Sequence, residues 1–252
     1  ILVFTHGLIP AAALACLEAL PGEACTALVN MNASRDGGEP TAAEIARRFE
    51  TLRRLGPRAM PGFTIYRADF QLDWLLEAIQ KTGCRPEIRL GLAQPALSAR
   101  NQALHPRQYR FVGQKIAQFA GRAGQRGVRL EFDCGFVRCM FSVEDLERLN
   151  QAHSPPALRC NPILDIDLDG QAAHCFPLAG RIQARLEGDS TAQELRESLA
   201  AQARPFRLAG VYPECSTCPH KQSGECTGGC LASALRRFRR APNRAAIPAG
   251  RG

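Results

Sequence analysis

The 252-residue sequence has no apolar stretch long enough to cross a membrane, because Pro10, Glu18 and Pro21 interrupt its longest candidate. It also lacks a secretion signal, since the N-terminal segment has no basic flank and is typical of a strand followed by a turn. Internal repeats are absent, and low complexity is confined to the C-terminal tail. These absences exclude an integral membrane protein, a secreted disulfide scaffold and a repeat protein.

The basic charge of the chain is unevenly placed. The formal net charge is +8, and residues 231–252 carry six arginines and no acidic residue. The rest of the chain is therefore close to neutral. We expect a solvated basic tail, with a possible acidic partner, rather than a nucleic-acid-binding surface.

Cysteine is abundant, with eleven residues, and most of it lies in the second half. Cys16, Cys25 and Cys84 are isolated, and the other eight fall between positions 134 and 230. A chain of this length forms an adequate core without covalent cross-links. Clustered thiols in a chain without a secretion signal indicate a reducing cytoplasm and metal binding.

Residues 1–133 alternate short apolar runs with amphipathic helical segments. We expect strands at 1–7, 25–34, 63–69, 86–95 and 128–133, and helices at 10–20, 41–56, 71–83 and 107–127. This alternation predicts parallel strands joined by helical crossovers, in a barrel, part of a barrel or a doubly wound sheet. Ligands of such folds bind at the carboxyl ends of the strands.

The pattern changes after residue 134, where proline, glycine and cysteine become frequent. A hairpin is expected at 159–178 with Asp169–Gly170 as its turn, followed by a helix at 191–203. We place a domain boundary near residue 140.

Eight cysteines form three groups in this half. They are Cys134 and Cys139, then Cys160 and Cys175, then Cys215, Cys218, Cys226 and Cys230. Zinc, disulfides and iron–sulfur clusters are all compatible with thiols at these spacings. Glycines near the last group allow the backbone to wrap closely around an inorganic core.

The spacing Cys160-x9-Gly170-x4-Cys175, followed by Cys215-x2-Cys218-x7-Cys226-x3-Cys230, resembles the SPASM domain of radical S-adenosylmethionine (radical SAM) enzymes. The N-terminal ILVFTHGLIP is similar to the third strand of their partial barrel. This resemblance implies two auxiliary 4Fe–4S clusters. The first would use Cys160, Cys175 and Cys230 with one further ligand, and the second Cys215, Cys218 and Cys226 with one further ligand.

Two features depart from the family pattern in the cysteine region. The usual five-residue gap is seven residues here, and no cysteine follows Cys230. We hypothesise that Cys134 and Cys139 supply the two missing thiolates. The alternatives are that one or both are buried apolar side chains, or that His220 or a water completes a site.

A third departure is the absence of the Cys-x3-Cys-x2-Cys motif, which in this family holds the cluster that cleaves S-adenosylmethionine. The resemblance therefore implies an N-terminally truncated enzyme that could not start radical chemistry alone, so its status as an enzyme is left open. The GGEP at 37–40 follows the wrong strand for the family motif. We interpret it as a turn leading into a helix.

The fold class expected from the resemblance is α/β. It comprises a partial (β/α) barrel at 1–140, a SPASM-like iron–sulfur domain at 141–235 and a basic, disordered tail at 236–252. The family also implies that Asn30, Asn32 and Ser34 contact the ribose of S-adenosylmethionine, against the alternative of ordinary strand-end capping.

The expected partners are a peptide or small-molecule substrate and an electron donor such as a flavodoxin or ferredoxin, with no membrane and no nucleic acid. The resemblance implies that the parent enzyme abstracts hydrogen with a 5′-deoxyadenosyl radical, in a reaction such as peptide modification. The alternative function is a zinc-stapled, non-catalytic binding module.

Overall fold

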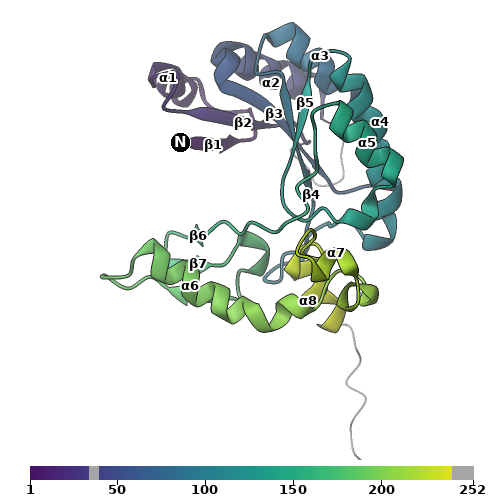
Figure 1. Ribbon diagram of the computed structural model, residues 1–252. Coiled ribbons are helices and arrows are strands. Elements are labelled where there is room, and N and C mark those ends of the chain that lie inside the picture. The colour runs from purple at the N-terminus through teal and green to yellow at the C-terminus, as the bar shows by residue number, and fades with distance from the viewer. Residues whose placement is uncertain (34–39, 240–252) are drawn as a thin grey trace, which may run out of the picture.

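The computed structural model describes residues 1–33 and 40–239. It contains a curved α/β unit and, beneath it in Figure 1, a smaller C-terminal unit of short strands and helices. No helix among the described residues is both long enough and apolar enough to span a bilayer.

The α/β unit is built on five parallel strands whose spatial order equals their order along the chain. The strands are β1 (Leu2–Thr5), β2 (Thr26–Asn30), β3 (Ala59–Ile65), β4 (Glu87–Leu92) and β5 (Arg129–Phe132). The helices between them are α1 (Ala11–Ala19), α2 (Ala42–Leu55), α3 (Asp73–Thr82) and α4 (Tyr109–Gly124). This arrangement confirms the predicted α/β fold with parallel strands.

Local signals in the sequence fix where two of these helices begin and end. The Thr41 side chain accepts a hydrogen bond from the Glu44 amide, and the Glu44 carboxylate accepts one from the Thr41 amide, so a capping box starts α2. The predicted helix start after GGEP is therefore present, although residues 37–39 lie outside the described part. Gly83 ends α3 in the left-handed conformation.

Strand β3 starts four residues earlier than predicted. Ala59 to Gly62 pair in register with Ala27 to Asn30, although Pro61 and Gly62 disfavour strands. All four residues of this part of β3 are buried, so packing outweighs local propensity.

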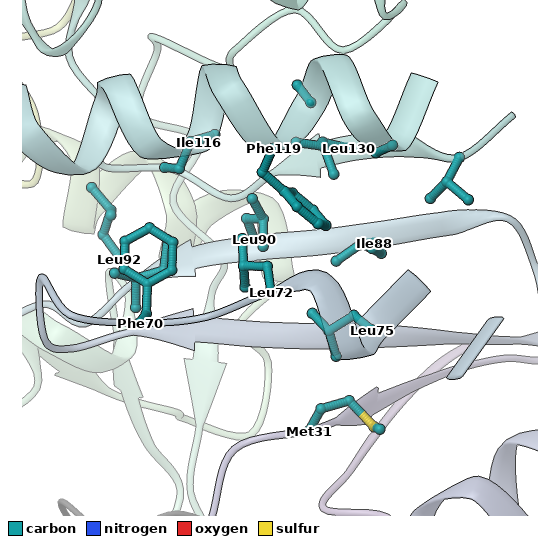
Figure 2. Packing of buried hydrophobic residues seen from close by; sticks show 14 of the residues in the cluster. Met31, Phe70, Leu72, Leu75, Ile88, Leu90, Leu92, Ile116, Phe119 and Leu130 are labelled. Atoms are coloured by element: carbon teal, nitrogen blue, oxygen red, sulfur yellow. The ribbon is translucent and has the colours of Figure 1, made fainter. Parts of the chain in front are cut away.

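The main core lies between the sheet and helices α3 and α4. Figure 2 shows Phe119 and Ile116 of α4 pointing at Leu90 and Leu92 of β4, with Leu75 of α3 beside them. All five side chains are buried. Burial of these apolar side chains stabilises the position of the strands in the sheet.

The segment after β5 contains a helix that we did not predict, α5 (Val143–Gln151), which packs on α4. Ser142 caps it through a reciprocal pair of hydrogen bonds with Asp145. Its nine residues are too few to give a clear periodic pattern.

The C-terminal unit contains the predicted hairpin, extended by a third strand. Its strands are β6 (Asp165–Ile166), β7 (Gln171–Ala173) and β8 (Gln183–Arg185), all antiparallel. Its helices are α6 (Ala192–Ala203), α7 (Pro219–Gln222) and α8 (Leu231–Arg239). Helix α8 extends into the segment predicted as a tail, and residues 240–252 are outside the described part.

Candidate functional site

The concave face of the sheet borders a cavity of about 790 Å³. All five strands or their carboxyl ends line it, including Phe4, Asn30, Phe63, Arg89 and Asp133. This position matches the general location of ligand sites in parallel α/β folds.

One ion pair dominates the polar part of this cavity. Arg89 Nε donates to Asp133 Oδ1 at 2.6 Å, and the Arg89 guanidinium lies over the Phe4 ring at 5.8 Å from its centroid. A Cβ added at Gly91 would lie only 3.1 Å from the Asp133 carboxylate. Glycine at this position therefore leaves room for the carboxylate beside β4.

The two described polar residues at the end of β2 have different surroundings. Asn30 lines the cavity, and its side-chain oxygen accepts a hydrogen bond from the Asn32 amide. The Asn32 side chain is bonded to the backbone of Thr64, as donor at 2.8 Å and as acceptor at 2.7 Å. Asn32 thus ties the ends of β2 and β3 together. Ser34 lies outside the described residues.

Four cysteines form what we call the first cysteine set: Cys134, Cys160, Cys175 and Cys230. The Cys134 thiol donates a hydrogen bond to the Cys160 sulfur, and Cys175 and Cys230 are within electrostatic reach of both. These residues come from the end of β5, the segment before β6, the end of β7 and the start of α8. Sulfurs separated by up to 96 positions are thereby brought together.

The surroundings of the first set shift the pKa values of its thiols in different directions. The hydrogen bond from Cys134, opposed by burial and helped by the nearby Arg207 guanidinium, lowers the pKa of Cys160 to about 6. The same bond and burial raise the pKa of Cys134. Burial and the neighbouring thiols raise the pKa of Cys175 to about 12. Metal binding would be required to hold several of these thiols deprotonated together.

The other four form the second cysteine set: Cys139, Cys215, Cys218 and Cys226. Burial first, and then the proximity of the other three sulfurs, raise the pKa of Cys139 to about 11. Cys139 lies in the short 3-10 turn η3 (Arg138–Met140), directly beyond β5. Each set therefore takes one sulfur from the segment after β5 and three from later residues.

The backbone around the sets is closely packed. The Cys160 amide donates to Thr227 Oγ1 at 3.0 Å, which joins the segment before β6 to the loop before α8. A Cβ at Gly229, whose φ is +84°, would contact Val137 and Val211 at under 3.0 Å. The loop between Cys226 and Cys230 therefore requires glycine at this position.

Within the described residues, no three His, Cys, Asp or Glu side chains stand close enough to share one metal ion. Neither cysteine set is therefore arranged as a single-ion site in this structure.

Three polar residues lie near the first set: Gln94, Tyr109 and Arg207. Gln94 follows β4, at the carboxyl end of a strand where ligands are expected. The sequence carries no signal that Tyr109 or Arg207 lies near the sulfurs, because each reaches them only through the tertiary fold.

Comparison with known proteins gives agreement at the level of fold. No protein-family model matches the sequence, and no curated protein matches it either. Among solved structures, the chain is similar to anSMEcpe with bound AdoMet (S-adenosylmethionine), at 13% identity and a TM-score of 0.58, over 94% of this chain and 70% of that one. The neighbour is an anaerobic sulfatase-maturating radical SAM enzyme with a SPASM domain.

Two further structures of anSMEcpe contain AdoMet and a peptide, named Cp18Cys in one and Kp18Cys in the other. Each has a TM-score of 0.56, at 15% and 14% identity respectively, over 91% of this chain and 65% of the neighbour. The chain thus shares the fold of these structures and corresponds to 65–70% of their length.

Proposed function

We propose that this chain is the cluster-carrying part of a radical SAM enzyme, with one auxiliary 4Fe–4S cluster bound by each cysteine set. The observation that supports this most strongly is the gathering of eight cysteines into two sets of four. Cys134 and Cys139 each complete a set whose other members follow the SPASM spacing. Four thiolates are the usual complement of a 4Fe–4S cluster.

The donor sets fit iron–sulfur clusters better than zinc. Four sulfurs of a zinc site lie about 2.3 Å from one ion, so they must be close together. Within residues 1–33 and 40–239, no three such side chains stand close enough to share one ion, which disfavours zinc. Among the described residues, buried hydrogen-bond donors without partners, Tyr109 Oη and Gln94 Nε2, also stand beside the sulfurs, which supports an acceptor at this place. When bound, such clusters supply electron transfer or a coordination site for substrate.

The cavity on the sheet would take S-adenosylmethionine and the reacting part of the substrate. Its volume of about 790 Å³ is within the usual range for ligand sites. Asn30 would serve as an acceptor or donor towards the ribose, and the Arg89–Asp133 pair would orient a polar or charged substrate group. The peptides in the neighbouring structures support a peptide substrate.

The initiating cluster is not assigned to these 252 residues, because they contain no Cys-x3-Cys-x2-Cys motif. We propose that the whole enzyme also contains the remaining strands and that motif. We further propose that the enzyme works in a reducing cytoplasm and receives its electrons from a flavodoxin or a ferredoxin.

Anaerobic reconstitution with iron and sulfide tests the cluster assignment. We expect brown protein with broad absorbance near 400 nm and about eight iron and eight sulfide atoms per chain. Colourless protein that retains stoichiometric zinc after the same treatment would contradict the proposal and favour the zinc-stapled binding module.

A further inference from the structure

Tyr109 is a fully buried residue at the first position of α4, and its hydroxyl has no hydrogen-bond partner of normal geometry. Burial raises the pKa of Tyr109 to about 12, and the nearby side chains of Gln94 and Ser233 partly oppose this rise, although neither meets the hydroxyl with the geometry of a full hydrogen bond. An unpaired buried hydroxyl destabilises a fold by about 1–3 kcal/mol. Its retention inside the protein therefore indicates an acceptor that is present in the functional state.

Cysteines of both sets lie within electrostatic range of the hydroxyl. Cys230 of the first set and Cys139 of the second set both act electrostatically on Tyr109, and Cys230 has the larger effect. The Tyr109 ring also packs edge-on against Tyr212, at 6.3 Å between centroids. This edge-on packing fixes the orientation of the phenol ring.

Gln94, just after β4, presents a second donor without a partner. Its Oε1 accepts a hydrogen bond from Ser233 Oγ at 2.8 Å, whereas its buried Nε2 has no acceptor. A Cβ added at Gly135 would lie 2.6 Å from this Nε2 and 3.8 Å from Cys230 Cβ. The carboxamide nitrogen is therefore packed against the turn that follows Cys134.

Cys230 is already the target of other donors. Burial raises the pKa of Cys230, and the backbone N–H groups of Ala232 and Ser233, in the first turn of α8, partly oppose this rise. Amides at a helix start favour an anionic sulfur. A metal-bound thiolate or a bridging sulfide here would be a strong acceptor for the unpaired donors of Tyr109 and Gln94 as well.

We propose that Tyr109 and Gln94 are positioning residues that donate hydrogen bonds to sulfur atoms of the cluster bound by the first cysteine set, and so raise its reduction potential. This inference rests on the proposed function. Reduction adds negative charge to the cluster, and donors to sulfur stabilise the more negative state. Removing either donor should therefore shift the midpoint potential to more negative values.

The test is an EPR-monitored redox titration of the reconstituted full chain and its variants. The signal that disappears in Cys175→Ala identifies the first cluster. Tyr109→Phe and Gln94→Met should each shift the midpoint of this signal to more negative potential, with iron content unchanged. Tyr212→Phe is the matched control, because the Tyr212 hydroxyl already donates to the Pro106 carbonyl at 2.6 Å, and we expect no shift.

A second measurement separates hydrogen bonding to a cluster from a structural role. In metal-free protein, Tyr109→Phe should raise the urea midpoint of unfolding, since it removes an unpaired buried hydroxyl. In the reconstituted protein the same substitution should lower it. A shift of the same sign in both states would overturn the inference.

The two proposals fail in different ways. Wild-type protein that takes up no iron contradicts the proposed function. Variants with full iron content and an unchanged midpoint potential leave the clusters in place and contradict the role of Tyr109 and Gln94 alone.

Discussion

Arg89 of β4 and Asp133, which follows β5, form an ion pair on the cavity face of the sheet, with 2.6 Å between Arg89 Nε and Asp133 Oδ1. The Arg89 side chain is 20% exposed and that of Asp133 is 38% exposed. Because the pair is partly shielded from water, the attraction between the two charges should contribute more to stability than it does in a surface ion pair.

A double-mutant cycle should measure this dependence. We expect Arg89→Met and Asp133→Asn to be coupled by about 1 kcal/mol in the free energy of unfolding, determined with urea. The exposed pair Lys81–Glu77 is the control, since its side chains are 63% and 58% exposed and its coupling should stay below about 0.5 kcal/mol. Equal coupling in the two pairs would show that the cavity pair is not shielded.

The iron content of single Cys variants should show which cysteine set each residue belongs to. Cys134→Ala should remove the first cluster and Cys139→Ala the second, so each variant should retain about four of about eight iron atoms after reconstitution. Cys16→Ala provides the control, because Cys16 belongs to neither set and should leave iron content unchanged. Full iron content in both variants would show that these thiols are not ligands.

The thiols of the metal-free protein should differ in reactivity. The pKa of Cys160 is lowered to about 6, mainly by the hydrogen bond from Cys134, whereas that of Cys175 is raised to about 12 by burial. Near neutral pH, Cys160 is therefore a thiolate and Cys175 a thiol, and only thiolates react with iodoacetamide.

Peptide mapping by mass spectrometry should show that Cys160 is modified first, at a rate that falls as the pH drops below about 6. In Cys134→Ala the hydrogen-bond donor is lost, so the pKa of Cys160 should rise and its modification near neutral pH should slow. Faster labelling of Cys175 than of Cys160 would contradict the assigned hydrogen bond.

Close packing of α4 on η3 should make Gly113 intolerant of any side chain. A Cβ there would lie 2.1 Å from the Met140 carbonyl oxygen, which belongs to the turn that carries Cys139. Gly113→Ala should therefore lower the free energy of unfolding by about 1–3 kcal/mol and reduce iron at the second set.

Gly121→Ala on the same helix is the matched control for Gly113→Ala. Its Cβ would meet only the flexible Arg148 side chain at 3.4 Å. This substitution should increase stability by up to about 1 kcal/mol through helix propensity. A similar effect of both substitutions would show that the approach of α4 to η3 is looser than the structure has it.

The sequence allowed the alternating strands and helices of residues 1–133 to be predicted, because each element carries its own periodic pattern. It failed where tertiary packing decides. Pro61 concealed the start of β3, and β8 (Gln183–Arg185) has too few apolar residues to be recognised. Helix α5 had a usable signal in the Ser142 and Asp145 capping box, although the acidic residue is Asp rather than the more common Glu.

The candidate site divides in the same way. The spacing of the later cysteines identified them as cluster ligands. Each expected cluster lacked one ligand, and Cys134 and Cys139 were the candidates for these two positions. The sequence could not place Cys134 beside Cys160 or Cys139 beside Cys215, because those contacts depend on how the C-terminal unit docks. Gln94 was expected only as part of the polar rim at the strand ends, and Tyr109 carried no signal of its own, since a single polar residue in an apolar helix stripe is common.

The origin of the sulfurs has a mechanical consequence. Cys134 and Cys139 follow the sheet, while their partners begin at Cys160, so inorganic cores at both sets would cross-link the two halves of the chain at neighbouring points. Closing such long loops restricts the unfolded ensemble. The loaded protein should then melt as one cooperative unit in calorimetry, whereas iron starvation would leave two separately melting halves and make the chain a substrate for proteolysis.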